Sequence, residues 1–290
     1  MKADLKRLRD RVSFLTNIKP PRNYRNIDSL NRVADFINLE LGGYGCEVVE
    51  QTFKVDGHTY RNVIGSIGPK EASRIVVGAH YDVAGDQPGA DDNASAVAGL
   101  LETARLMEPY QHRLKKRIDF VAYSLEEPPF FGSPSMGSAV HARSLYEEGV
   151  PVELMICFEM IGYFTDKRGS QSYPASISEE SRPDRGNFIT VVGIEKFSKL
   201  ADKLTNLMQR YAKVKVEGIT FSSYHGLPGL SDHKNYWEHG YPAIMITDTS
   251  FLRNPHYHQE SDTIETLDFF RMAEVINGVS GALVEMAKGE

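Results

Sequence analysis

Several features are scarce or absent in this sequence. Only two cysteines occur among its 290 residues, Cys46 and Cys157, so a disulfide framework does not hold the fold together, and both thiols are expected to be buried. No apolar run approaches the roughly 18 to 20 residues needed to span a bilayer. A Gly-x-Ser-x-Gly motif is also absent. These absences argue against a disulfide-stapled domain, an integral membrane protein and an α/β hydrolase with a serine nucleophile.

Positive charge is not in excess either. The chain has 33 basic and 39 acidic side chains, a formal net charge of -6, which gives no electrostatic signature for nucleic acid or an anionic membrane. The charged segment at residues 1–11 lacks the apolar core of a signal peptide, so we expect a soluble cytoplasmic protein. The sequence predicts neither a nucleic-acid partner nor a membrane partner, and it does not indicate the oligomeric state.

Apolar, strand-like runs alternate with amphipathic helical stretches along the chain. Strands are expected at 46–55, 60–65, 74–80, 118–125, 152–158, 188–194 and 242–247, with a hairpin turn at Asp56–Gly57. Helices are expected from Ser29, as the cap, to Gly42–Gly43, and then at 97–104, 138–148, 196–211 and 267–283. The alternation predicts a three-layer α/β/α fold with a mixed, mostly parallel central sheet.

The length suits one large core, so residues 1–290 are expected to form a single domain. One segment inside it differs in composition. Residues 163–186 are rich in Ser, Pro, Gly and charge, which is typical of a long loop. Because this segment follows closely after Glu159, we expect it to border the active cleft.

Potential metal ligands stand at the carboxyl ends of the predicted strands. His80 ends one strand, Glu126 and Glu127 follow the next, and Glu159 closes a third within a strongly apolar setting. Ligands bind beyond the carboxyl ends of strands in such sheets, so one rim can collect these side chains. A lone histidine at a strand end is more often structural. A buried Glu159 without a partner, however, would cost several kcal/mol unless neutral, and a nearby cation explains it.

Two short acidic motifs strengthen this interpretation. Asp82 forms a His-x-Asp pair with His80 and can accept a hydrogen bond from the far ring nitrogen, which orients a metal-bound imidazole. Farther along, Asp91, Asp92 and Asn93 crowd the entrance of a helix. One of Asp92 and Asn93 can cap that helix. Asp91 is assigned to metal, because adjacent acids repel unless a cation or a cap compensates.

A histidine pair near the end of the chain completes the set. His256 and His258 precede the last helix, and either could equally be an exposed loop residue. Two imidazoles and three carboxylates suit two zinc ions that share one ligand, while Glu126 remains beside them to move protons. Cobalt or manganese is also compatible with such a site. The expected metal ligands are His80, Asp91, Glu127, Glu159 and His258.

In these motifs the chain resembles the M28 family of zinc peptidases, the co-catalytic aminopeptidase family that includes bacterial leucyl aminopeptidase. The matching stretches occur in the family's order: His80-Tyr81-Asp82, Gly89 to Ser95, Glu126-Glu127 with Gly132-Ser133, Glu159-Met160-Ile161-Gly162, Ser231-Asp232-His233, and His258 ahead of Asp262-Thr263. The spacing to Asp262-Thr263 favours His258 over His256. The resemblance implies a zinc exopeptidase that acts on peptides with a free N-terminus.

The resemblance also implies a role for each ligand. His80 and Glu159 would hold one zinc, Glu127 and His258 the other, and Asp91 would bridge both, with Glu126 as the general base. A cis peptide bond is implied between Asp91 and Asp92. The chain departs from the family in two places. Many members carry Asp at the position of Glu159, and Pro128–Pro129 replaces a glycine-containing turn.

Other functions on the same framework stay open. A glutaminyl cyclase uses a single zinc, and retention of all five ligands argues for two metals and hydrolysis instead. A carboxypeptidase would want a basic cluster for the terminal carboxylate of its substrate, whereas only isolated arginines occur, at 143, 168, 182, 185 and 253. A non-catalytic binding domain would have lost a ligand or the base. Candidates for a substrate pocket, for which ordinary packing is the simpler role, are Phe130, Phe131, Tyr163, Phe164 and Tyr224.

Overall fold

The predicted hairpin forms one edge of the sheet in the computed structural model, which describes residues 1–175, 177 and 182–288. β1 (Glu47–Val55) and β2 (His58–Ile67) pair antiparallel along their whole length. Asp56 and Gly57 form the turn, both at positive φ, as a tight hairpin of this kind requires. The hairpin is therefore confirmed, and β2 joins it to the rest of the sheet by pairing antiparallel with β4.

In the described part of the chain, six further strands complete one mixed sheet: β3 (Arg74–His80), β4 (Arg117–Tyr123), β5 (Val152–Glu159), β6 (Phe188–Ile194), β7 (Lys215–Phe221) and β8 (Ala243–Thr247). Their order is β1-β2-β4-β3-β5-β8-β6-β7. The pairs β3 with β4, β3 with β5, β5 with β8 and β6 with β7 are parallel, whereas β6 and β8 are antiparallel. The prediction of a mixed, mostly parallel sheet is confirmed.

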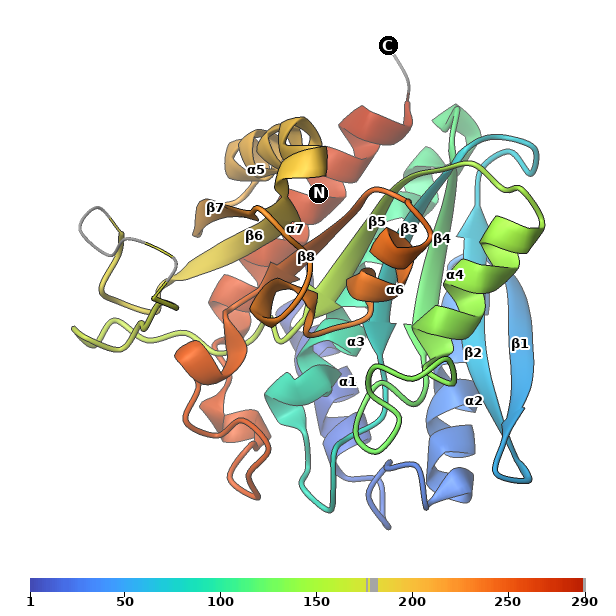
Figure 1. The fold of residues 1–290 in the computed structure, drawn as a ribbon, viewed down its shortest axis with the longest axis horizontal. Helices are drawn as coiled ribbons and strands as arrows, with labels where there is room; N and C mark the ends of the chain where they lie inside the picture. The colour runs from blue at the N-terminus through green and yellow to red at the C-terminus, as the bar shows by residue number, and fades with distance from the viewer. Residues whose placement is uncertain (176, 178–181, 289–290) are drawn as a thin grey trace.

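Helices cover both faces of this sheet. One face carries α1 (Leu5–Thr16), α2 (Ile27–Gly43), α3 (Ala96–Met107), α5 (Ser198–Tyr211) and α7 (Phe269–Ala287), which contact one another. The opposite face, nearest the viewer in Figure 1, carries α4 (Gly137–Glu147) and α6 (His233–Glu238). The three-layer prediction is confirmed. None of the helices in the described residues is both long and apolar enough to cross a membrane.

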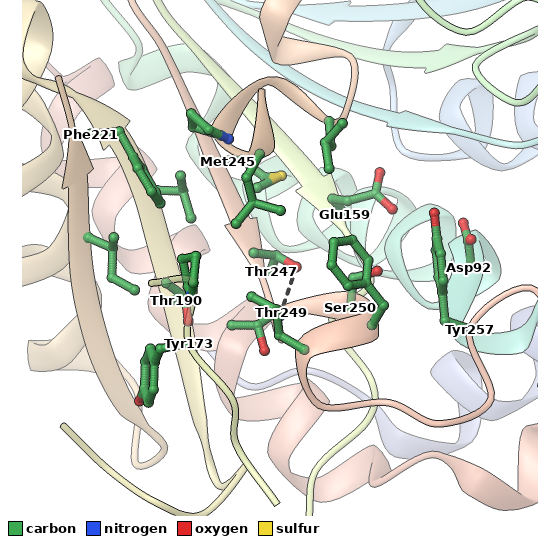
Figure 2. A pocket seen from close by; sticks show the side chains of 18 of the residues that line it. Asp92, Glu159, Tyr173, Thr190, Phe221, Met245, Thr247, Thr249, Ser250 and Tyr257 are labelled. Carbon is green, nitrogen blue, oxygen red and sulfur yellow. Dashed lines mark hydrogen bonds between the residues drawn. The ribbon is translucent and has the colours of Figure 1, made fainter. Parts of the chain in front are cut away.

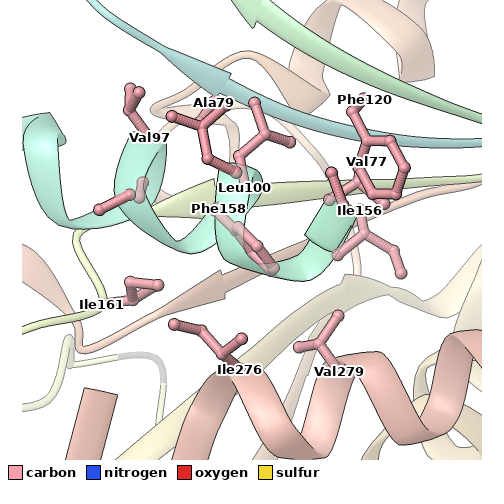
Figure 3. Close-up of a cluster of buried hydrophobic side chains, with 14 of the residues drawn as sticks. Val77, Ala79, Val97, Leu100, Phe120, Ile156, Phe158, Ile161, Ile276 and Val279 are labelled. Atoms are coloured by element: carbon pink, nitrogen blue, oxygen red, sulfur yellow. The ribbon is translucent and has the colours of Figure 1, made fainter. Parts of the chain in front are cut away.

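The main core lies between the sheet and the layer that contains α3 and α7 (Figure 3). Strand residues such as Val77, Phe120 and Ile156 meet Leu100 of α3 and Ile276 of α7, and all are fully buried. Burial of each such side chain contributes about 1.5–3 kcal/mol. This rigid support fixes the carboxyl ends of β3, β4 and β5, where the polar side chains stand.

Three elements were not predicted from the sequence. α1 has a signal that could have revealed it, because Leu8, Val12 and Leu15 recur at helical spacing and are buried, and Asp4 caps its first turn. β7 is an edge strand and α6 is short. The predicted start of α2 was wrong by a few residues. The helix begins at Ile27, and the Ser29 hydroxyl donates to the carbonyl of Pro20 rather than capping.

Candidate metal centre and active site

The acidic rim forms where three adjacent parallel strands end. His80 is the last residue of β3 and Glu159 the last of β5, while Glu126 and Glu127 lie in the loop just after β4, which ends at Tyr123. Since β3 lies between β4 and β5, these ends are neighbours in the sheet. All four side chains are buried. The structure thus brings together the four strand-end residues that the sequence singled out.

The imidazole of His80 faces several carboxylates. Its Nε2 atom lies 3.4 Å from Asp92 Oδ1, 3.4 Å from Glu159 Oε2 and 3.8 Å from Glu126 Oε2. Its Nδ1 atom lies 3.5 Å from Asp82 Oδ1, an ion-pair distance that is long for a hydrogen bond. Burial alone would lower the pKa of His80, but the charges of Glu126 and Glu159 outweigh it and raise that pKa well above its ordinary value.

His258 faces the same centre from the other side. Its Nε2 atom lies 3.1 Å from Asp92 Oδ2 and 3.4 Å from Glu127 Oε2. Burial lowers the pKa of His258, yet the carboxylates of Asp92 and Glu127 raise it overall to about 10. His256 lies apart, with its Nδ1 against the Ser261 hydroxyl. His258 is therefore the histidine that completes the cluster.

The spacing of these donors matches that of zinc ligands. Two donors that each lie about 2.0–2.1 Å from a tetrahedral zinc ion are about 3.3 Å apart. The four separations from His80 Nε2 and His258 Nε2 to the carboxylates of Asp92, Glu159 and Glu127 fall between 3.1 and 3.4 Å. His80 with Asp92 and Glu127, and His80 with Glu126 and Glu159, are groups whose donor atoms lie close enough together to share a cation.

The carboxyl groups of the centre lack sufficient compensating charge without such a cation. Burial, together with the charge of Asp92, raises the pKa of Glu127 to about 8. Burial, with Glu127 and Glu159 nearby, raises the pKa of Glu126 well above its ordinary value. Glu127 Oε1 and His258 Nε2 are buried atoms without a hydrogen-bond partner. Carboxylate and imidazole groups that are crowded together and lack hydrogen-bond partners fit the ligands of a divalent cation.

The acid between the two histidines is Asp92, and the expectation for Asp91 was wrong. The two carboxylate oxygens of Asp92 face His80 and His258 separately. Asp91 points away from the histidines, and its carboxylate accepts hydrogen bonds from the Gly162 amide at 2.9 Å and from Asn254 Nδ2 at 2.7 Å. Adjacent acids in one turn project in different directions, and the sequence gives no sign of which one faces the rim.

The neighbouring peptide geometry differs from the prediction in the same way. The cis bond joins Asp92 to Asn93, one residue later than expected. Neither of these residues caps α3. Asn93 instead binds the end of β5, because its Nδ2 donates to the carbonyl of Phe158 and its Oδ1 accepts from the Met160 amide. The turn that carries Asp92 is thus attached to the strand that carries Glu159.

Backbone amides anchored by carboxylates hold the ligand loops in place. Asp82, at the position expected to orient His80, accepts from the amides of Glu126 and Glu127 at 3.2 and 3.1 Å. Asp262 similarly accepts from the amides of Asp91 and Asp92 at 2.9 and 3.1 Å. Asp82 therefore joins the loop after β3 to the paired glutamates, a contact that the sequence alone did not reveal.

Glu159 has its own anchor. The hydroxyl of Ser231 donates to Glu159 Oε2 at 2.6 Å, and the thiol of the buried Cys157 lies 3.3 Å from that hydroxyl. The neighbouring Asp232 is fully buried, and burial raises its pKa to about 7. The Ser231-Asp232 pair therefore lies directly beneath the carboxylate that faces His80.

A deep pocket opens beside the centre (Figure 2). Its volume, with the mouth included, is about 1100 Å³. Asp92 and Glu159 lie at one end, and Phe221, Thr190 and Tyr173 lie at the other. The floor consists of alternate residues of three strands, namely Thr190, Val192, Ile219, Phe221, Met245 and Thr247. The walls come from loops and include Phe131, Tyr173, Pro174, Ile177, Leu227, Pro228, Leu230, Phe251 and Tyr257.

Of the predicted aromatic candidates, only Phe131 lines this pocket in the described residues. Phe130 packs against Tyr24 and Tyr60, and Tyr224 packs against Trp237. The predicted loop at 163–186 contributes Gln171, Tyr173, Pro174 and Ile177 to the lining, while residues 176 and 178–181 lie outside the described part. The strand-floor residues could not be assigned from the sequence, because an apolar strand residue in a pocket resembles one in a core.

Comparison with known proteins identifies the family. The model for peptidase family M28 matches residues 62–281, which is more than half of the chain. The chain belongs to peptidase family M28. An M28 chain is a peptidase, and this is the enzyme class that the resemblance implied. The resemblance inferred from the sequence motifs is thereby confirmed.

The sequence relatives of this chain include an uncharacterized protein and a probable leucine aminopeptidase. The chain is 44% identical over 287 residues to YfbL of Escherichia coli, an uncharacterized protein, covering 96% of this chain and 87% of YfbL. It is 27% identical over 265 residues to a probable leucine aminopeptidase 1 of Trichophyton verrucosum. That match covers 84% of this chain, which spans only 62% of the fungal protein's length.

Solved structures with lower sequence identity to this chain share its fold. A zinc aminopeptidase of Bacillus subtilis has a TM-score of 0.78 at 15% identity and covers 98% of this chain and 95% of its own. A glutaminyl cyclase of Bacteroides thetaiotaomicron has a TM-score of 0.72 at 21% identity and covers 100% and 99%. Because the same fold serves both chemistries, the fold alone does not choose between them.

Proposed function

We propose that this chain is a dizinc aminopeptidase that removes apolar residues from peptides with a free N-terminus. The position of Asp92 supports this most directly. One of its oxygens faces His80 at 3.4 Å, and the other faces His258 at 3.1 Å. A carboxylate with one oxygen toward each of two imidazoles suits a ligand shared by two metal ions. Such a shared ligand is characteristic of two-metal hydrolytic sites.

The ligand set divides into two triads around this shared acid. His80, Asp92 and Glu159 would hold one zinc ion, and His258, Asp92 and Glu127 would hold the other. Bound zinc ions would polarise the scissile carbonyl and lower the pKa of a water molecule from about 16 toward about 7. Asp82 would orient His80, whose Nδ1 lies 3.5 Å from Asp82 Oδ1, and it fixes the loop that carries Glu127 through the amide hydrogen bonds described above. Asp82 is thus a positioning residue.

Glu126 is the residue that would move protons. It lines the pocket beside the ligands, and its Oε2 lies 3.8 Å from His80 Nε2. Neither triad needs it as a ligand. Its carboxylate would accept the proton of the attacking water and return it to the departing amine. Burial and the neighbouring Glu127 carboxylate, which raise the pKa of Glu126 well above its ordinary value, favour holding that proton between the two steps.

The pocket supports an apolar substrate side chain. Its floor is largely aliphatic or aromatic, and no Lys or Arg is among its lining residues in the described chain. A carboxypeptidase would need a cation there to bind a terminal carboxylate. Arg253 is unsuitable for this role, because it is 5% exposed, does not line the pocket, and donates to Gln171 Oε1 and to the carbonyl of Phe188. The pocket is therefore better suited to the side chain of an N-terminal residue such as leucine or phenylalanine.

The test is cleavage of matched peptides by zinc-loaded protein, followed by mass spectrometry. One peptide begins with leucine, a second is the same peptide N-acetylated, and a third begins with aspartate. We expect loss of the first residue from the free leucine peptide only. The Glu126→Gln variant should retain its zinc, by elemental analysis, but lose activity by a factor of about 100 to 10,000.

A glutamine-led peptide distinguishes the cyclase. Loss of ammonia without loss of a residue would identify cyclisation and reject the aminopeptidase. Cleavage of the acetylated peptide would reject the requirement for a free N-terminus. Equal cleavage of the aspartate and leucine peptides would reject the apolar pocket preference while leaving the chemistry intact.

A further inference from the structure

Arg22 is a buried cation behind the metal centre. It lies between α1 and α2, outside the residues 62–281 that match the M28 model, and its side chain is 1% exposed. Its guanidinium donates to main-chain carbonyls. Nε binds the carbonyl of Tyr81 at 2.9 Å, Nη1 binds those of Leu15 at 3.2 Å and Pro88 at 2.6 Å, and Nη2 binds that of Gly89 at 2.6 Å.

Three of these carbonyls, those of Tyr81, Pro88 and Gly89, mark the two ends of one chain segment. Tyr81 stands between His80 and Asp82, whereas Gly89 comes just before the turn that carries Asp92. The guanidinium fork therefore spans residues 81–89, the connection between the two ligand-bearing loops. The amide of Val83 completes the contact by donating to the carbonyl of Arg22 at 3.2 Å. A planar group with fixed donor directions suits such a bridge, and an ammonium group does not.

The next residue holds the middle of the same connection. Asn23 is also 1% exposed, and its Nδ2 donates to the carbonyl of Gly85 at 2.9 Å and to Asp86 Oδ1 at 3.1 Å. Together Arg22 and Asn23 bind the connection at its start, centre and end. Residues close to the N-terminus thus supply a hydrogen-bonded support for a loop far along the sequence.

The charge of Arg22 also acts on the centre. Burial lowers its pKa to about 10, so the guanidinium is protonated at neutral pH, and the carboxylates of Asp262, Asp92 and Asp82 act in the opposite direction. Its donors bind neutral carbonyls, so the charge is not neutralised by a direct carboxylate contact. It therefore offsets part of the repulsion among the buried acids above it.

We propose that Arg22 is a positioning residue for the metal centre, which with Asn23 holds residues 81–89 so that His80 and Asp92 keep the separation a shared zinc site needs. The proposal rests on the proposed dizinc function, because it assigns these contacts to the same centre. It gives the segment before the family-matched region a supporting role at the metal centre. Arg22 itself touches neither substrate nor metal.

Zinc affinity of Arg22→Lys, measured by competition with a chromophoric chelator, tests the proposal. Lysine keeps the charge but cannot bind the carbonyls at both ends. We expect zinc affinity to fall about 10-fold to 100-fold, the range typical of residues that orient ligands. For the leucine peptide, kcat should fall more than KM rises. Arg11→Lys is the matched control, since Arg11 is 3% exposed but binds Glu40 and Glu102 away from the centre.

The control should lose thermal stability while its zinc affinity stays within about twofold of the parent protein. Unchanged or tighter zinc binding by folded Arg22→Lys would overturn the proposal. If Arg22→Lys does not fold, Asn23→Ala tests the proposal instead. We expect Asn23→Ala to lower zinc affinity by a smaller factor than Arg22→Lys, and an unchanged zinc affinity would overturn the proposal. Zinc affinity needs no substrate, so a parent protein that is inactive on every peptide would reject the proposed function without affecting this result.

Discussion

Two pairs of histidines show how the rim of the sheet differs from the layer formed by α4 and α6. His80 and His258 face carboxylates, and these raise the pKa of both despite burial. His141 of α4 and His233 of α6 lack such neighbours, and burial lowers the pKa of each to about 4. His141 Nδ1 contacts the hydroxyl of Tyr236 at 2.6 Å, and His233 Nε2 contacts the carbonyl of Pro228 at 2.6 Å.

The comparison separates ligands from structural residues by surroundings rather than by residue type. A neutral histidine that is hydrogen-bonded once and packed against aromatic rings stabilises the fold. A histidine whose ring nitrogen faces two or three carboxylates at the spacing of zinc ligands is arranged for a cation. If this distinction is right, changes at the rim should affect metal binding, and changes in the α4 and α6 layer should affect only stability.

The largest effect is expected from Asp92→Asn. It replaces the shared carboxylate with an amide, so both triads lose a charged ligand, and activity should fall about 1000-fold or more, beyond the 10-fold to 100-fold typical of orienting residues. Zinc content by elemental analysis and peptide cleavage both measure this. Asp91→Asn is the matched comparison at the adjacent position.

Asp91→Asn should instead retain two zinc ions and lose stability. Both oxygens of Asp91 accept hydrogen bonds, so an amide nitrogen would face a donor in either orientation, at a cost of about 1–3 kcal/mol. Zinc loss confined to Asp91→Asn would restore Asp91 as the shared ligand and contradict the geometry.

An intermediate effect is expected from His258→Gln, which removes one imidazole from one triad. We expect the zinc content to fall from two ions to one, because only the triad of His258, Asp92 and Glu127 loses a ligand. His141→Gln should do the reverse. It should keep both zinc ions and lower the free energy of unfolding, since the buried Tyr236 hydroxyl loses one of its two partners and keeps only the Tyr123 hydroxyl. Equal zinc loss in both variants would remove the distinction between the two pairs.

Much of the fold could be predicted because local signals and tertiary structure agree. The run Ile75 to Ala79 is apolar enough to be buried on both faces, and it forms a central parallel strand. β7 escaped prediction because this edge strand contains exposed residues such as Lys215, and only Val216 and Ile219 among its residues are buried. Residues 1–16 were interpreted only by their charge, although the buried stripe of Leu8, Val12 and Leu15 carries the helical signal of α1.

The site could be predicted to the level of loops but not always of single residues. His80 and Glu159 are the last residues of strands, where side-chain direction follows from position, and Glu127 lies in the loop that follows β4. Asp92 sits in an irregular turn, and there neither helical nor strand periodicity says which neighbour faces the rim. Arg22 could not be found at all, because its partners are carbonyls distant in sequence, which leave no mark in side-chain patterns.

The smallest effect concerns pH and the structural histidines. His141 has a pKa of about 4 when folded and about 6.5 when unfolded, so between these values the unfolded chain binds a proton that the folded chain does not. Its contribution to stability is therefore present above about pH 6.5 and declines as the pH falls toward 4. From about pH 7.5 to 5, the stability advantage of the parent protein over His141→Gln should shrink by about 2 kcal/mol, at 1.36 kcal/mol per pH unit below 6.5. The rim carboxyls titrate in both the parent protein and His141→Gln, so their contribution to the pH dependence cancels in the difference between the two urea titrations. An advantage that stays constant would mean that His141 is charged in the folded protein, and the contrast between the two pairs would then rest on geometry alone.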